Sequence, residues 1–173
     1  MTTRQTANIA EPISGDKLYQ ERARQAFPLL VRQAEAGQTV FYSSLAEELE
    51  MPNPRNLNYV LGSIGQTLEN LSKVWKEPIP PIQCLVINKV TGLPGEGIGW
   101  FLVKKEEFSK LSRLKQREIV SGELARIRAY PKWPAVLSAV GLAPTKANFR
   151  QLNAAAAREG MGGGESEQHR KFK

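Results

Sequence analysis

Residues 42–71 read YSSLAEELEMPNPRNLNYVLGSIGQTLENL, and this stretch decides the fold. Its first part predicts a short helix, because Ser44 and Glu47 have the spacing of a capping box and an apolar side follows them. That helix is expected to stop at the Met51-Pro52 step, because proline cannot continue it.

A second, longer helix is predicted to begin almost at once. Asn53 can act as its N-cap, and Pro54 suits the first turn, where a missing N–H group has no cost. The apolar positions then recur at helical spacing, at Leu57, Val60, Leu61, Ile64, Leu68 and Leu71. A short helix, a tight turn and a helix with a polar start indicate a helix-turn-helix. An ordinary helical hairpin within an all-α core is the alternative.

The neighbouring segments favour the helix-turn-helix. An amphipathic helix is predicted from Asp16 to Gly37, and residues 39–42 predict a brief strand or an extended approach to the next helix. After three prolines that end the long helix, the sequence predicts a buried strand, a turn-rich loop and a return strand, at residues 82–88, 91–97 and 99–103. Helix, helix and hairpin in this order are typical of a winged helix, with residues 90–98 as the wing.

The remaining segments predict further helices and two tails. Residues 105–128 are expected to be helical, with Gly122 permitting a break, and residues 130–134 to form a turn; short helices are expected at 135–140 and 146–158. We therefore expect a mainly α fold with a small β-hairpin, a winged helix-turn-helix plus C-terminal helices. The expected boundaries are a flexible arm, a winged-helix domain with a basic helical extension, and a flexible linker and tail, at residues 1–14, 15–158 and 159–173.

Charge and composition indicate the class of partner. The chain holds 24 lysines and arginines against 17 acidic residues, a net charge of +7 that favours polyanions such as nucleic acid. Residues 104–128 hold eight basic residues and four acidic ones, so more than half of that surplus lies in one stretch. No apolar run is long enough to cross a bilayer and no signal-peptide pattern opens the chain. We expect a soluble protein of the cytoplasm without a membrane partner.

The sequence offers little for catalysis. Cys84 is the only cysteine and His169 the only histidine, which argues against a disulfide, a Cys/His zinc site and a Ser/His/Asp set. The glycine-rich residues 92–97 lack the Lys-Ser/Thr of a phosphate-binding P-loop. We therefore expect no cofactor, no metal site and no catalytic residue, and no enzymatic activity of the chain alone.

Base contacts are predicted at the start of the second helix. Arg55, Asn56 and Asn58 occupy its first turn, where recognition helices present side chains to base edges. In the major groove arginine favours guanine and asparagine favours adenine. The alternative is that Asn56 only supports the helix cap and Arg55 is ordinary surface charge.

Further DNA contacts are expected around this start. Tyr42 can reach a base or the backbone, although packing against the core is the alternative for this ring. Lysines in and after the wing suit phosphates, because each phosphate neutralised releases counterions. The full set of these flanking contacts is Tyr42, Ser43, Tyr59, Ser63, Lys89, Lys104 and Lys105.

Part of the chain resembles a known family. Residues Thr39-Val40-Phe41-Tyr42-Ser43-Ser44-Leu45-Ala46, then Pro54-Arg55, a proline-led strand and a glycine-rich loop resemble the DNA-binding domain of O6-alkylguanine-DNA alkyltransferases and their inactive alkyltransferase-like relatives. The resemblance covers about residues 34–99 and implies a winged helix that docks on DNA. The family's reactive run is Pro-Cys-His-Arg, and Cys84 lacks those neighbours. We therefore expect Cys84 to be a core residue whose pKa is raised, rather than a nucleophile.

Two further resemblances concern the system to which the chain belongs. Residues 80–95 look more closely like a bacterial domain of mostly unassigned proteins, several of which belong to restriction or phage-defence systems. Residues 162–173 look, more weakly, like the linker and opening helix before a restriction-type nuclease fold. A solvated charged tail is the alternative for the latter. The sequence thus predicts a module that binds double-stranded DNA in a restriction, phage-defence or repair system, partnered by a nuclease domain or another subunit. The alternatives are a protein-interaction winged helix, and the recognition half of a nuclease whose catalytic domain is absent from this chain.

Overall fold

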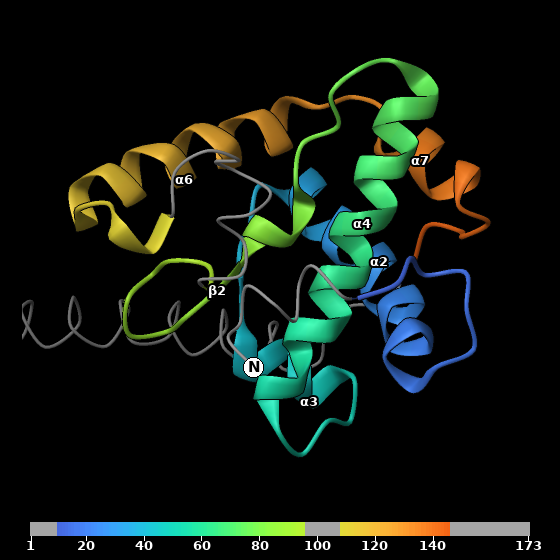
Figure 1. Cartoon of the computed structure of the whole chain (residues 1–173), viewed down its shortest axis with the longest axis horizontal. Coiled ribbons are helices and arrows are strands. Elements are labelled where there is room, and N and C mark those ends of the chain that lie inside the picture. Colours follow the sequence, from blue (N-terminus) through green and yellow to red (C-terminus); the bar gives the residue numbers. More distant parts are fainter. Residues whose placement is uncertain (1–9, 96–107, 146–173) are drawn as a thin grey trace, which may run out of the picture.

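The computed structural model describes residues 10–95 and 108–145, and Figure 1 shows their helices crossing around a shared core. The first long helix, α2 (Leu18–Ala36), buries Ala23, Phe27 and Leu30 among its apolar residues, as the helical spacing predicts. It ends at Gly37, whose φ of 70° is a left-handed conformation that glycine adopts without a steric penalty.

The predicted pair of helices after it is present. α3 (Tyr42–Glu48) is followed by a single 3-10 turn, η1 (Pro54–Asn56), and by α4 (Leu57–Trp75). The Asn53 side chain accepts a hydrogen bond of 3.1 Å from the backbone N–H of Arg55, which confirms the predicted cap. The capping box at Ser44 was wrong: α3 begins at Tyr42, because the extended residues before it lead directly into the helix.

Among the described residues, the β structure is arranged differently from the prediction. β1 (Val40–Phe41) pairs in parallel with β2 (Val86–Ile87), with Val40 opposite Val86. The first half of the expected strand at 82–88 is a buried 3-10 turn, η2 (Ile82–Leu85), packed against α2, α4 and α6. The two described strands therefore form no hairpin. Residues 96–98 of the expected wing and the return strand at 99–103 lie outside the described residues.

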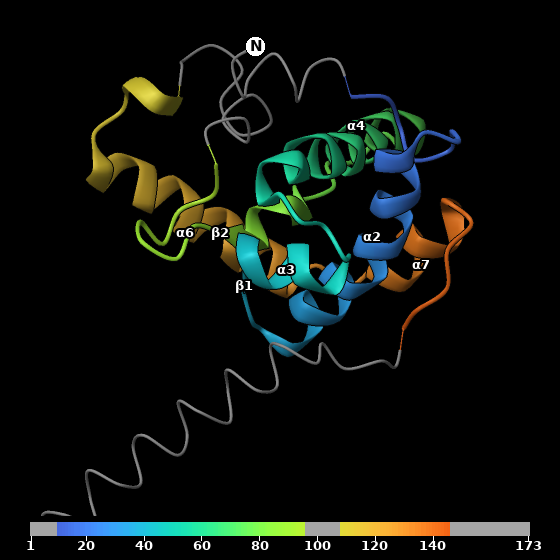
Figure 2. The same cartoon turned by 90° about the horizontal axis from the view of Figure 1, so that it is seen from below.

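Helices complete the described chain. The short turn η4 (Phe108–Lys110) precedes α6 (Arg113–Ala129), which runs through Gly122 without a break, and α7 (Trp133–Ala139) follows. Figure 2 shows α7 beside α2, and the first half of α6 extending beyond the other helices next to the loop that follows β2. The predicted class, mainly α with a small β component, is confirmed. The expected helix at 146–158 and the tail at 159–173 lie outside the described residues.

The described end of the expected flexible arm is packed on the core. Ala10 and Ile13 are buried, and the backbone N–H of Ile13 donates a hydrogen bond of 3.0 Å to Thr67 Oγ1 on α4. Burial of these apolar side chains holds residues 10–13, which the sequence assigned to the arm, against the core. No helix within the described part of the chain combines the length and apolar content needed to cross a membrane.

Candidate nucleic-acid interface

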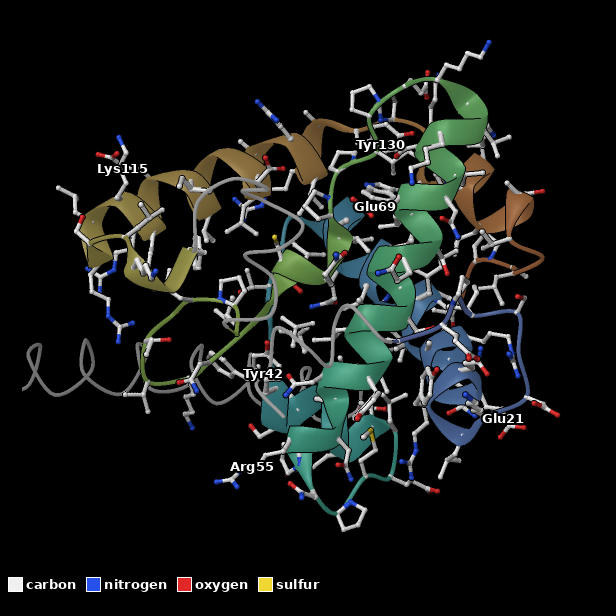
Figure 3. All side chains as sticks on the ribbon, in the orientation of Figure 1. Glu21, Tyr42, Arg55, Glu69, Lys115 and Tyr130 are labelled. Atoms are coloured by element: carbon white, nitrogen blue, oxygen red, sulfur yellow. The ribbon has the colours of Figure 1, made fainter. Side chains whose placement is uncertain are left out.

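The turn η1, directly before α4, faces solvent at one end of the molecule. Arg55 and Asn56 are exposed and Asn58 is half-buried, so the first two predicted base contacts are accessible and the third only in part. Figure 3 shows Arg55 pointing away from the ribbon, with Tyr42 above it. Within the described residues no carboxylate forms an ion pair with Arg55. Its guanidinium group therefore has donors available for an external acceptor.

Tyr42 is an anchor rather than a free contact. Its hydroxyl oxygen accepts a hydrogen bond of 2.8 Å from the backbone N–H of Gly95, and burial raises the pKa of the phenol. A Cβ at position 95 would lie 2.7 Å from that oxygen, so the close approach requires glycine. Of the two interpretations of Tyr42, the structure therefore favours packing, and the ring ties α3 to the loop after β2.

That loop, residues 88–95, is compact. The Asn88 side-chain oxygen accepts hydrogen bonds from the backbone N–H groups of Val90 and Thr91, and the Asn88 N–H donates to the Leu93 carbonyl at 2.8 Å. Lys89 and Val90 are left exposed at its tip. Because β2 pairs with β1, the Lys89 ammonium comes within 5.9 Å of the Phe41 ring centroid. The parallel pairing thus brings the expected phosphate contact Lys89 beside the start of α3.

The other expected flanking contacts differ in their surroundings. Ser43 is exposed on the first turn of α3. Tyr59 is half-buried, and its ring lies 5.5 Å from that of Tyr19 on α2, centroid to centroid. Lys104 and Lys105 lie outside the described residues.

Ser63 was wrongly expected to reach a phosphate. It is fully buried, and its hydroxyl oxygen has no hydrogen-bond partner among the described residues. The reason is that α4 is covered on more than one side, by α2 and by η2, so the face that continues from Arg55 enters the core within two turns.

We expect Ser63→Ala to leave duplex binding unchanged and to raise the free energy of unfolding by about 1 kcal/mol, because it removes an unsatisfied buried hydroxyl. Urea denaturation and a duplex titration on the same preparation measure both quantities. A variant with weakened DNA affinity at unchanged stability would contradict this placement.

The basic helix α6 lies next to the loop of residues 88–95, and the sequence did not predict this proximity. Leu93 packs against Phe108 and Val120, so residues 88–95 rest on the first half of α6. Arg113 and Thr91 line the same hollow between loop and helix. The exposed basic residues between positions 108 and 129 are Lys110, Arg113, Lys115, Arg117, Arg126 and Arg128. The charge surplus was visible in the sequence, but its position beside Lys89 follows only from the packing.

Acidic residues limit the direction from which a polyanion can approach. α3 contacts η1 and carries Glu47 and Glu48, and Glu50 follows it. A phosphate backbone is repelled there and attracted at the loop and α6. The charges therefore favour an approach to Arg55 from the side of Lys89.

Cys84 is a core residue, as expected. It is completely buried on η2, and burial, with a smaller contribution from Glu123, raises the pKa of the thiol well above its ordinary value. A neutral, inaccessible thiol is a poor nucleophile. Within residues 10–95 and 108–145, no cluster of three His, Cys, Asp or Glu side chains could hold a metal ion.

We expect Cys84 to stay unlabelled by a thiol reagent such as DTNB in the folded protein and to react fully in guanidinium chloride. The raised pKa of the folded state also means that stability falls as the pH rises past the ordinary thiol range, since only the unfolded chain then ionises. Cys84→Ala supplies the blank for the labelling. Rapid labelling of the folded protein would show that the thiol is accessible.

Comparison of the chain with models of known protein families, with curated proteins and with solved structures finds no significant match.

Proposed function

We propose that this chain is a double-stranded DNA-binding module of a restriction, phage-defence or repair system, acting in the cytoplasm without catalysis of its own. The observation that carries the proposal is the exposed turn η1, capped by Asn53 directly before α4, where Arg55 and Asn56 face solvent without an ion pair to any described carboxylate. The resemblance to alkyltransferase-like domains supports the same role. A nuclease domain or another subunit is the proposed partner that would supply chemistry.

Different residues would contact the bases and the phosphates of the duplex. Arg55 and Asn56 would contact base edges, because arginine and asparagine side chains can each form two hydrogen bonds to a purine. Lys89 and the exposed cations of α6 would contact phosphates, which position the duplex without reading sequence. The N–H of Gly95 stays bonded to Tyr42, so the loop keeps its position when DNA docks.

A duplex titration at several salt concentrations tests this proposal. If about four phosphates are neutralised, the affinity should fall about a hundredfold between about 50 and about 200 mM salt. Lys89→Ala should lower the slope of log affinity against log salt by about one unit, at every duplex sequence. An affinity that is independent of salt, or no binding to any duplex, would reject the proposal.

Two exposed apolar residues support a second candidate, a protein-interaction module. Val90 at the loop tip is 92% exposed and Leu114 on α6 is 70% exposed. Under this alternative, Val90→Asp and Leu114→Asp would abolish binding of a partner subunit, whereas reversing the charges of Arg55 and Lys89 would not. Under the DNA proposal, the charge reversals would have the larger effect on duplex binding.

A further inference from the structure

A hollow lies between the loop of residues 88–95 and the start of α6, two segments that Figures 1 and 2 both show side by side. Its volume is about 360 Å³, and sites for small molecules typically enclose about 300–1,000 Å³. Leu93, Phe108 and Gln116 are buried and form its inner wall. The hollow therefore has the size for a small ligand or for the end of a larger one.

The wall of this hollow is polar and has no acidic side chain among the described residues. More of the surface exposed in it is polar than apolar, and its polar side chains are those of Asn88, Thr91, Arg113 and Gln116. Of these four only Arg113 carries a charge, so the electrostatic potential of the wall favours an anion.

Three of these side chains keep hydrogen-bond donors for a ligand. Arg113 is exposed and pairs with no carboxylate that the structure describes. Asn88 is also exposed, and its Oδ1 accepts hydrogen bonds from the backbone N–H groups of Val90 and Thr91, which leaves both protons of Nδ2 to donate. Thr91 Oγ1 accepts a hydrogen bond of 3.2 Å from the Leu93 N–H, which leaves the hydroxyl proton. The acceptors are thus used within the loop, and the donors remain.

We propose that the hollow binds the phosphate monoester of a nucleotide. Such a group carries about 1.5–2 negative charges at neutral pH and has three strong acceptor oxygens. An arginine binds it through two parallel hydrogen bonds, and Asn88 and Thr91 would donate to its other oxygen. The hollow is larger than a phosphate group, so the attached sugar or base would pack beside Leu111, which is half-buried on the wall.

Two sources can supply this group, a free mononucleotide and the terminal phosphate of a nucleic-acid strand. Only the second source rests on the DNA binding proposed above. AMP is the probe for the first source, and adenosine, which lacks the phosphate, is its control. For the second source, a duplex with a 5′-phosphate is compared with the same duplex that ends in a hydroxyl.

NMR titration of the full-length, ¹⁵N-labelled chain measures these four affinities. At least one phosphorylated probe should bind at least about tenfold more tightly than its control, the factor that corresponds to one charged hydrogen bond. It should shift the backbone resonances of Thr91 and Gly95 and the side-chain NH₂ of Asn88. The probe that gains from its phosphate identifies the source. If neither gains, the proposal is overturned.

Two variants of the wall and one control locate the bound phosphate. Arg113→Ala removes the charged donor and should lower the affinity for the phosphorylated probe at least about tenfold. Asn88→Asp keeps an oxygen for the loop N–H groups but places a negative charge in the hollow, so a similar loss is expected. Lys73→Ala removes one exposed charge from α4, away from this hollow, and should change the affinity by less than about twofold.

Two results with these variants would contradict the proposal. Equal losses in Arg113→Ala and Lys73→Ala would show attraction by net charge alone, and an unchanged affinity of Asn88→Asp would place the phosphate elsewhere. The ¹⁵N spectrum of each variant shows whether its fold is kept. Duplexes without a 5′-phosphate test the proposed DNA binding separately, so either proposal can fail while the other stands.

Discussion

Replacing Arg55 with alanine is expected to weaken duplex binding by about 5- to 150-fold, which corresponds to about 1–3 kcal/mol for one bidentate contact to a base. The Arg55 side chain is exposed on η1, directly before α4, and the backbone N–H of Arg55 already donates a hydrogen bond to the Asn53 cap. The substitution therefore removes the side-chain donors and leaves the helix start intact. Stability should stay within about 0.5 kcal/mol of the wild type, as for other surface changes.

The pattern of the loss identifies the contact. Duplexes of varied sequence and base modification should be titrated against wild type, Arg55→Ala and the control variant Lys73→Ala, which removes an exposed positive charge from the last turn of α4. A loss confined to some duplexes places Arg55 on a base, and a uniform loss places it on a phosphate. If Arg55→Ala binds every duplex as tightly as the wild type, the start of α4 is not the interface.

Replacing Trp133 with alanine is expected to lower the free energy of unfolding by about 3–5 kcal/mol, the range for a large buried side chain replaced by a small one. The indole is 1% exposed, and its ring meets that of Tyr130 edge-on, 4.8 Å away. Its N–H donates a hydrogen bond of 2.9 Å to the Ile127 carbonyl, which joins α7 to the end of α6. A cavity and an unpaired carbonyl would both remain after the substitution.

Trp133→Phe separates these two effects. Phenylalanine keeps most of the apolar volume but cannot donate to Ile127, so a smaller loss of about 1–3 kcal/mol is expected. Urea denaturation measures the free energy of unfolding of both variants. If this free energy depends on urea concentration with the same slope as in the wild type, the proteins unfold in the same transition and their free energies can be compared. A loss below about 1 kcal/mol for the alanine variant would mean that α7 contributes little to the core.

The local features of the fold could be predicted from the sequence. The spacing of apolar residues indicated the buried sides of α2 and α4, and Asn53-Pro54 indicated where the second helix of the helix-turn-helix begins. The isolated Cys84, without basic neighbours, was correctly interpreted as a core residue. Each of these inferences depends on residues within one or two turns of each other, where local geometry decides the outcome.

Contacts between distant segments could not be predicted in this way. The pairing of Val40 with Val86, and the bond from Gly95 to Tyr42, join residues that no local pattern relates. Ser63 illustrates the same difficulty, because a polar residue on a helix normally predicts a position that is exposed to solvent. A usable signal was present nearby: Gly62 and Gly65 flank that serine, and small residues in a helix allow another element to approach closely.

The parallel pairing of β1 with β2 also determines when, during folding, Lys89 comes to lie beside the start of α3. The elements α3, α4 and η2 all lie between Val40 and Val86, so a long segment must close before Lys89 reaches the start of α3. Closing a long loop carries an entropy cost that local helices do not have, and contacts of this kind slow folding. In a nascent chain that ends before Val86, Lys89 and α6 do not yet exist, so the chain would engage no partner through the surface that η1, residues 88–95 and α6 form together.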